Sequence, residues 1–210
     1  MPLEPHFDLE KGLNYIDKFL DLEVTLFDDG TNHTDIQINP TLGPIPNALV
    51  ESIIQSKHPA KILEIGTSVG QTAINMANIA RSYGGKVTTI EINAKIAEIA
   101  FSNIDHFELN DNIEIIIGDA NKVINQLKGP FGLVIQDGKK DLYIKMLDRI
   151  ISLMEPGGIL LSDDILFPIM FDNPKAMTLD PYNQALKEDK RLKTVWLPIG
   201  DGVAISTKCY

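Results

Sequence analysis

The sequence predicts an α/β domain whose mostly parallel sheet is covered by helices on both faces. Three observations support this fold class. From residue 61 onward short strands alternate with helices, the strands are apolar and β-branched, and the turn sequence PIGDG joins the last two strands. Alternation of this kind with apolar strands is typical of a parallel sheet that is buried on both sides. The turn-rich connection predicts an antiparallel C-terminal hairpin at one side of the sheet.

Each element is predicted from apolar periodicity and from the turn residues around it. The strands are expected at residues 61–65, 86–91, 113–117, 132–136, 158–162, 192–197 and 203–208. The helices among them are expected at residues 71–82, 94–107, 120–127, 142–154 and 181–190, with a loop from 163 to about 180. Ahead of the sheet, helices are expected at 9–22 and 45–57, joined by a polar segment with glycine and proline that folds over a site.

Length and charge limit what the chain can be. With 210 residues and 44% hydrophobic content it can bury one substantial core, and no linker or repeat divides it. We therefore expect a single domain over residues 1–210, in which residues 1–58 form an N-terminal helical cap and lid. The formal charge of −10 argues against nonspecific binding to nucleic acid or to anionic membranes.

The sequence also indicates where the protein resides. Apolar runs such as Ile113–Ile117 are too short to cross a bilayer, and the N-terminus has no basic segment followed by an apolar one. We expect a soluble, cytoplasmic protein without membrane contact. Cys209 has no second cysteine for an internal disulfide, and the four histidines lack the spacing of a zinc site.

A glycine turn follows the first predicted strand, in the segment KILEIGTSVGQTA. Gly66 and Gly70 allow a ligand to approach the backbone closely, and the helix that follows offers free N–H groups. The spacing is GxxxG without a following GK[ST], so the usual pyrophosphate cradle is missing. Glu64 suits a cationic ligand such as S-adenosylmethionine, which carries a sulfonium and an ammonium group. The alternative is a glycine that only packs the strand against the helix.

Acidic residues gather at the carboxyl ends of the predicted strands, where such sheets bind ligands. Glu91 is placed to bind both hydroxyls of a ribose, and Asp119 lies where an adenine edge is expected. Taken singly, each of these residues is equally well explained as a helix N-cap or a turn former.

A second group combines Asp137, Asp163 and Asp164, which follow two strands expected to be neighbours. A cluster with oxygen ligands and no histidine or thiolate suits a hard divalent ion such as Mg²⁺ or Ca²⁺. Lys140 comes three residues after Asp137 and is placed to stand above the metal. Capping by the carboxylates and a solvated Lys140 are the alternatives.

The motifs LEIGTSVGQTAINMA, VTTIEIN, IIIGDA, GLVIQDGKKDLYIKML, LMEPGGILLSDDILF and WLPIGDGVAIS resemble, in this order, those of the metal-dependent O-methyltransferases. This family contains the catechol and caffeoyl-CoA O-methyltransferases, and the similarity covers residues 36–208. It implies a Rossmann-like, seven-stranded sheet, frequent homodimers, and a divalent cation, with Mg²⁺ expected first and Mn²⁺ or Ca²⁺ as alternatives.

The resemblance also implies roles for single residues. Lys140 is the expected catalytic lysine, and Asp137, Asp163 and Asp164 are the expected metal ligands. The cofactor S-adenosylmethionine is expected to contact Ile38, through its backbone, and Glu64, Gly66, Thr67, Ser68, Thr72, Glu91, Asp119, Ala120 and Asp137.

The sequence departs from the family pattern at three places. Asp164 stands where the family usually has asparagine, which adds a charge to the metal site. Lys139 stands where plant-type members often have an aspartate. The loop after Asp164 lacks a glycine commonly found there and is apolar instead. Because this loop shapes the acceptor pocket in the family, the departures leave the acceptor open.

Together these observations predict a divalent-metal-dependent, S-adenosylmethionine-dependent O-methyltransferase whose acceptor is a chelating, catechol-like or vicinal-oxygen small molecule. A metal that binds two neighbouring oxygens orients them and makes the reacting hydroxyl more acidic. Lys140, with its pKa lowered by the nearby cation, would take its proton. Two alternatives stay open, a tRNA wobble 5-hydroxyuridine O-methyltransferase and a non-catalytic cofactor-binding module. A nicotinamide dehydrogenase fits the GxxxG turn poorly.

Overall fold

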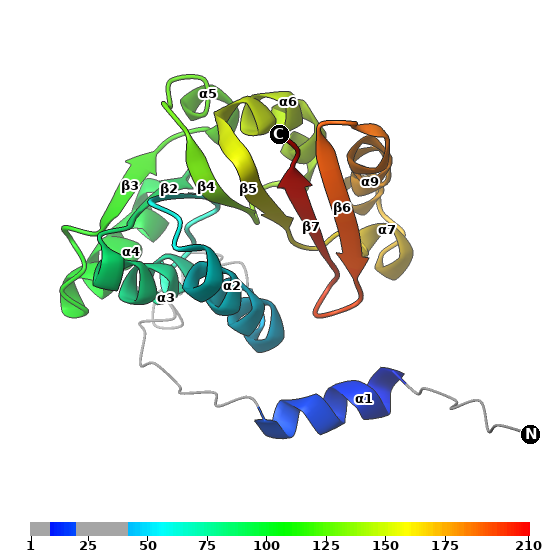
Figure 1. Cartoon of the computed structure of the whole chain (residues 1–210), viewed down its shortest axis with the longest axis horizontal. Helices are drawn as coiled ribbons and strands as arrows, with labels where there is room; N and C mark the ends of the chain where they lie inside the picture. The colour runs from blue at the N-terminus through cyan, green and yellow to red at the C-terminus, as the bar shows by residue number, and fades with distance from the viewer. Residues whose placement is uncertain (1–8, 20–41) are drawn as a thin grey trace, which may run out of the picture.

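The computed structural model describes residues 9–19 and 42–210, and in it a seven-stranded sheet lies between two layers of helices (Figure 1). The strand order is β3-β2-β1-β4-β5-β7-β6. The strands are β1 (Lys61–Ile65), β2 (Lys86–Glu91), β3 (Ile113–Ile117), β4 (Phe131–Gln136), β5 (Met154–Ser162), β6 (Leu192–Leu197) and β7 (Val203–Lys208).

Strands β1 to β5 pair in parallel, and β7 pairs antiparallel with both β5 and β6. The predicted fold class, with its antiparallel C-terminal hairpin, is therefore confirmed. The strand order reverses at β1, which pairs with β2 on one side and with β4 on the other. Such a switch point opens a crevice at the carboxyl ends of the strands, and this crevice is where the site lies.

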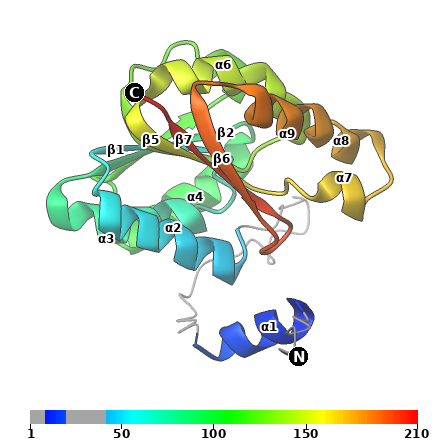
Figure 2. The ribbon, with the colours of Figure 1, turned by 45° about the vertical axis from the view of Figure 1, so that its right-hand side comes forward.

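The helices cover both faces of the sheet, with α2 and α3 on one side and α6 and α9 on the other (Figure 2). The described helices are α1 (Leu9–Ile16), α2 (Pro44–Lys57), α3 (Gln71–Ala80), α4 (Ala94–His106), α5 (Ala120–Val123), α6 (Tyr143–Leu153), α7 (Phe167–Met170), α8 (Pro174–Met177) and α9 (Leu179–Glu188). Short 3₁₀ turns lie at Asp17–Phe19, Arg81–Tyr83 and Lys140–Leu142. None of the helices within the described residues is both long and apolar enough for a bilayer crossing.

Two hydrophobic clusters fill the space between the sheet and its helices. Successive strand residues alternate between them, so that in β4 Val134 belongs to one cluster while Leu133 and Ile135 belong to the other. This alternation is the period of two that a buried strand imposes on its side chains. Both faces of the sheet are thus largely apolar.

The segment after β5 differs from its prediction. Residues 163–180, expected to form a loop, contain α7 and α8, and α9 begins at Leu179. Helix α8 starts because the Asn173 side chain accepts hydrogen bonds from the backbone N–H groups of Lys175 and Ala176, with Pro174 at the first helical position. Helices of four residues are too short to show an apolar periodicity, so the sequence pattern did not predict α7 or α8.

Helix α5 is also shorter than predicted and ends at Val123, and α1 ends at Ile16, followed by a 3₁₀ turn. The end of the predicted helix 9–22 and most of the polar segment after it lie outside the described residues. The proposed cap and lid over residues 1–58 therefore stays a prediction, although Gly43 and Pro46 at the start of α2 reach the site.

Candidate functional site

A cavity of about 680 Å³ opens at the carboxyl ends of the parallel strands. One side of it is formed by the β1 and β2 ends, and the other by the β4 and β5 ends with α7 and the β6–β7 turn. Its lining includes Gly43, Pro46, Gly66, Ser68, Glu91, Ile92, Ala120, Asp137, Lys139, Lys140, Asp163, Asp164, Phe167, Lys175 and Asp201.

The glycine turn connects the two sides of the cavity. Gly66 has a φ of +104°, and a Cβ atom placed there would lie 2.6 Å from the backbone oxygen of Asp137. Only glycine adopts this conformation readily and allows that approach. The backbone N–H of Asp137 donates to the carbonyl of Ile65 at 3.0 Å, so the loop carrying Asp137 is fixed against the end of β1.

Glu91 presents its carboxylate on the cofactor side of the cavity. One of its oxygens accepts from the backbone N–H of Ser68 at 3.0 Å and the other from that of Asn93 at 2.9 Å. These two bonds fix the carboxylate at the edge of the cavity, and each oxygen keeps a lone pair for a ligand hydroxyl.

Glu64, by contrast, does not line the cavity. Its carboxyl group is buried and accepts a hydrogen bond from Thr89 Oγ1 at 2.5 Å, and the Thr89 hydroxyl lies 2.7 Å from that of Thr67. Burial, helped by the charges of Asp137 and Glu91, raises the pKa of Glu64 to about 8. Glu64 and Thr67 therefore form a polar network behind the turn.

Two further predicted cofactor residues are absent from the cavity lining. Thr72 is buried in the first turn of α3. The Asp119 carboxylate accepts from the backbone N–H of Asn121 at 3.0 Å and so caps α5, which is the alternative that the sequence left open. Its neighbour Ala120 does line the cavity. Ile38 lies outside the described residues.

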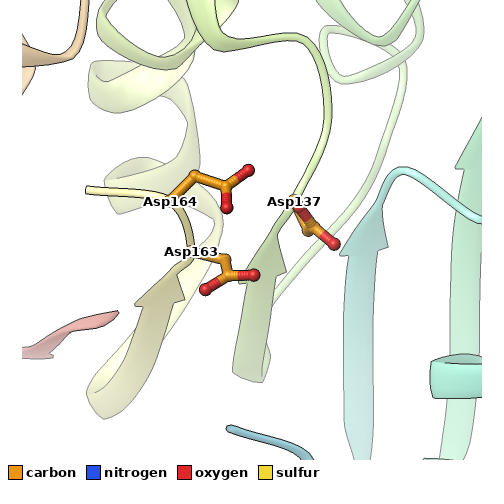
Figure 3. Close-up of side chains that lie close together, drawn as sticks. All are labelled: Asp137, Asp163 and Asp164. Atoms are coloured by element: carbon orange, nitrogen blue, oxygen red, sulfur yellow. The ribbon is translucent and has the colours of Figure 1, made fainter. Parts of the chain in front are cut away.

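The three predicted metal ligands meet at one place, where β4 and β5 end (Figure 3). One carboxylate oxygen from each of Asp137, Asp163 and Asp164 lies within 4.8 Å of the others. Burial and mutual repulsion raise the pKa of Asp163 to about 8, and burial raises that of Asp137 to about 6. Asp163 Oδ1 is buried and has no hydrogen-bond partner among the described residues.

Asp164 has a left-handed backbone conformation, with a φ of +62°. Aspartate and asparagine tolerate this region better than other residues with a side chain. The conformation explains why an Asp can stand where the resembling family has Asn, since both types suit the backbone and both offer an oxygen.

Lys140 lies over this carboxylate cluster. Its Nζ is 3.1 Å from Asp137 Oδ1 and also forms an ion pair with the Asp164 carboxylate. Burial lowers the pKa of Lys140, but the attraction of the two carboxylates outweighs burial and raises it. The side chain of Lys139 is largely exposed and pairs with Asp141 at 3.4 Å.

Asp201, Phe167 and Lys175 line the cavity but were missed by the sequence analysis. Asp201 belongs to the PIGDG turn, which was interpreted only as a hairpin connection. Because β7 lies between β5 and β6, this turn returns to the carboxyl end of β5, where Asp201 raises the pKa values of Asp137 and Asp164 further. The signal that could have identified Asp201 from the sequence is an acidic residue in a turn next to a predicted site.

Comparison with known proteins identifies the family. The chain matches a family model described as O-methyltransferase over residues 30–209. It is 23% identical over 183 residues to a caffeoyl-CoA O-methyltransferase of Stellaria longipes, covering 80% of this chain and 76% of that protein. It is 29% identical over 127 residues to a catechol O-methyltransferase of Sus scrofa, covering 57% of this chain and 68% of that protein.

A solved structure shows the same fold. The O-methyltransferase of Bacillus cereus in complex with SAH superposes with a TM-score of 0.79 at 22% identity, covering 92% of this chain and 97% of that chain. The family model spans much more than half of the sequence and includes every described strand. The chain therefore belongs to the family of S-adenosylmethionine-dependent O-methyltransferases.

Proposed function

We propose that this enzyme transfers a methyl group from S-adenosylmethionine to a hydroxyl of a chelating small molecule and needs a divalent cation to do so. The observation that carries the proposal is the placement of a three-carboxylate cluster on the same cavity as the cofactor turn. Asp137 belongs to that cluster, and its backbone contacts Gly66 of the turn. A methyl donor and an acceptor with two neighbouring oxygens would thus lie in one cavity.

The cofactor would occupy the β1 and β2 side of the cavity. Glu91 would accept hydrogen bonds from the two ribose hydroxyls, because its carboxylate is already oriented by Ser68 and Asn93. The backbone at Gly66 and Ala120 would border the rest of the cofactor. Glu64, Thr67, Thr72 and Asp119 would support this side without lining it.

The residues of the carboxylate cluster fit a divalent cation. All donors are oxygens, three carboxylates repel one another without a cation, and Asp163 Oδ1 has no partner among the described residues. Such a donor set suits Mg²⁺ first, with Mn²⁺ or Ca²⁺ as alternatives. When bound, the ion would supply a Lewis acid that orients two acceptor oxygens and acidifies the reacting hydroxyl.

Once a bound cation lowered its pKa, Lys140 would accept the proton of that hydroxyl at Nζ as a neutral amine. The geometry supports this role because Nζ reaches both Asp137 and Asp164 and so lies beside two of the residues that would hold the cation. Phe167 closes the same side of the cavity with an apolar ring, which suits a planar acceptor such as a catechol.

Methyl transfer to a panel of catechols and to undermodified tRNA, each with and without Mg²⁺, tests the proposal. We expect transfer to at least one catechol-like compound, dependent on the metal. Transfer to tRNA alone would show that the acceptor is a tRNA and not a small molecule. Tight cofactor binding without any transfer would favour a non-catalytic binding module. The expected homodimer stays a prediction, to be checked by sedimentation.

A further inference from the structure

The Lys140 ammonium group has a third partner, which does not belong to the carboxylate cluster. Its Nζ donates to the hydroxyl of Tyr143 at 3.1 Å. Tyr143 begins α6 and is completely buried, and its ring centroid lies 5.2 Å from the same Nζ. The centroid of the Phe167 ring lies 5.7 Å from Nζ.

The direction of these hydrogen bonds follows from counting protons. The Tyr143 hydroxyl has a single proton and donates it to the backbone carbonyl of Gln136 at 2.7 Å. Toward Lys140 it must therefore act as an acceptor. Burial raises the pKa of Tyr143 well above its usual value, so the hydroxyl keeps that proton. The three N–H groups of Lys140 then have three acceptors, which are Asp137, Asp164 and Tyr143.

The carbonyl that receives the Tyr143 proton is part of the site's framework. Gln136 is the last residue of β4, directly before Asp137, and the same carbonyl accepts from the backbone N–H of Asp163 at 3.1 Å. The Tyr143 hydroxyl thus links Nζ of Lys140 to the backbone that carries two of the three carboxylates. Movement of one relative to the other would break this link.

We infer that Tyr143 is a positioning residue, whose hydroxyl fixes Nζ of Lys140 beside the carboxylate cluster. The inference rests on the proposed function, because it gives Lys140 its role in methyl transfer. A bound cation would engage Asp137 and Asp164 and weaken their bonds to Lys140. Among the described partners of Lys140, the Tyr143 hydroxyl is the acceptor that a cation leaves in place.

The fold provides a matched control in Tyr182. It is also completely buried, its ring packs edge-on against that of Tyr143 at 5.2 Å, and its hydroxyl donates to the Gln136 side chain at 2.9 Å. It also bonds the Ser162 hydroxyl at 2.6 Å. Tyr182 makes no contact with Lys140 among the described interactions. Replacement by phenylalanine therefore removes a comparable buried hydroxyl at each position, but only Tyr143→Phe removes a partner of Lys140.

The first experiment observes Lys140 directly, by lysine side-chain NMR of the full-length protein without acceptor, before and after addition of Mg²⁺. The Lys140 ammonium signal is identified by its loss in Lys140→Arg. We expect a protected signal in the wild type and in Tyr182→Phe, and proton exchange at least about tenfold faster in Tyr143→Phe. An unprotected wild-type signal, an unchanged signal in Tyr143→Phe, or an equal loss in Tyr182→Phe would each overturn the inference.

The second experiment measures catalysis with Mg²⁺ and the best catechol of the panel. Tyr143→Phe should lower kcat about tenfold, with the KM for S-adenosylmethionine changed by less than about twofold. Tyr182→Phe should leave both unchanged. If the wild type methylates no acceptor, the proposed function fails, while the NMR comparison still decides whether Tyr143 fixes Lys140.

Discussion

The carboxylates on the two sides of the cavity are stabilised by different interactions. On the cofactor side, the lining carboxylate of Glu91 accepts hydrogen bonds from two backbone N–H groups. On the acceptor side, Asp137, Asp163 and Asp164 face one another, and a single ammonium group, that of Lys140, balances two of them.

This difference teaches which side is ready for its ligand. Backbone donors stabilise a carboxylate with no further partner, so the cofactor side is formed in the free protein. Clustered carboxylates with raised pKa values are unfavourable until a cation neutralises them. We therefore expect the acceptor side to depend on a metal and the cofactor side to be independent of it. Four predictions test this contrast, the first two on the acceptor side.

Removal of the metal should have the largest effect. Excess chelator, or the change Asp163→Ala, should reduce methyl transfer to background, because the ion contributes several kcal/mol of charge stabilisation. The affinity for S-adenosylhomocysteine, measured by calorimetry, should change by less than about twofold, since Glu91 needs no ion. Asp111→Ala, at an exposed residue before β3, is the control. Full activity in chelator would refute the proposed metal dependence.

Loss of Lys140 should have the second-largest effect on methyl transfer. Lys140→Ala should lower kcat by about 10²–10⁴-fold, the range for a positioned proton acceptor, with cofactor affinity nearly unchanged. The neighbouring exposed Lys139 provides the control, and Lys139→Ala should cost much less. The rate of the wild type should rise with pH through an ionisation that the Lys140 variant lacks. Near-normal kcat in Lys140→Ala would mean that the metal ionises the hydroxyl without help.

The cofactor side should respond in affinity rather than in rate of the chemical step. Glu91→Ala should weaken binding of S-adenosylmethionine and S-adenosylhomocysteine by about ten- to a hundredfold, because a hydrogen bond to a charged group contributes roughly 1.5–3 kcal/mol. The loss should be the same with and without Mg²⁺. Glu98→Ala, on an exposed position of α4, should bind normally. Equal affinity in wild type and Glu91→Ala would remove Glu91 from the site.

The last prediction concerns stability rather than activity, through the network behind the turn. The pKa of Glu64 is about 8 in the folded protein against an ordinary 4.5, so between these pH values the folded state holds the extra proton. The contribution of Glu64 to the free energy of unfolding therefore falls as pH rises from about 4.5 to 8. Glu64→Gln should remove that slope, so the variant should gain stability relative to wild type between pH 5 and pH 8. Urea denaturation at both values measures this gain, and an equal difference at both would contradict the raised pKa.

Much of the architecture follows from local sequence signals. Apolar strands with a period of two, helical periodicity and the PIGDG turn predicted the strands and their parallel and antiparallel pairing. The positions of Asp137, Asp163 and Asp164 directly after β4 and β5 were enough to predict their cluster, because neighbouring parallel strands end at the same edge. Helices α7 and α8 were not predicted because helices of one turn have no measurable periodicity.

What the sequence by itself determined is therefore the order of the elements, the strand ends and the residue types placed there. The tertiary structure alone decided which of those residues face the cavity. Glu64 and Glu91 both lie at strand ends, yet Thr89 of the neighbouring strand turns Glu64 into the interior, while Ser68 holds Glu91 at the cavity. The hydrogen bonds that connect Lys140 through Tyr143 to the end of β4 could not be predicted from the sequence either. The physical reason is that a side chain near a strand end takes its direction from hydrogen-bond partners on other elements, and spacing along one chain does not specify them.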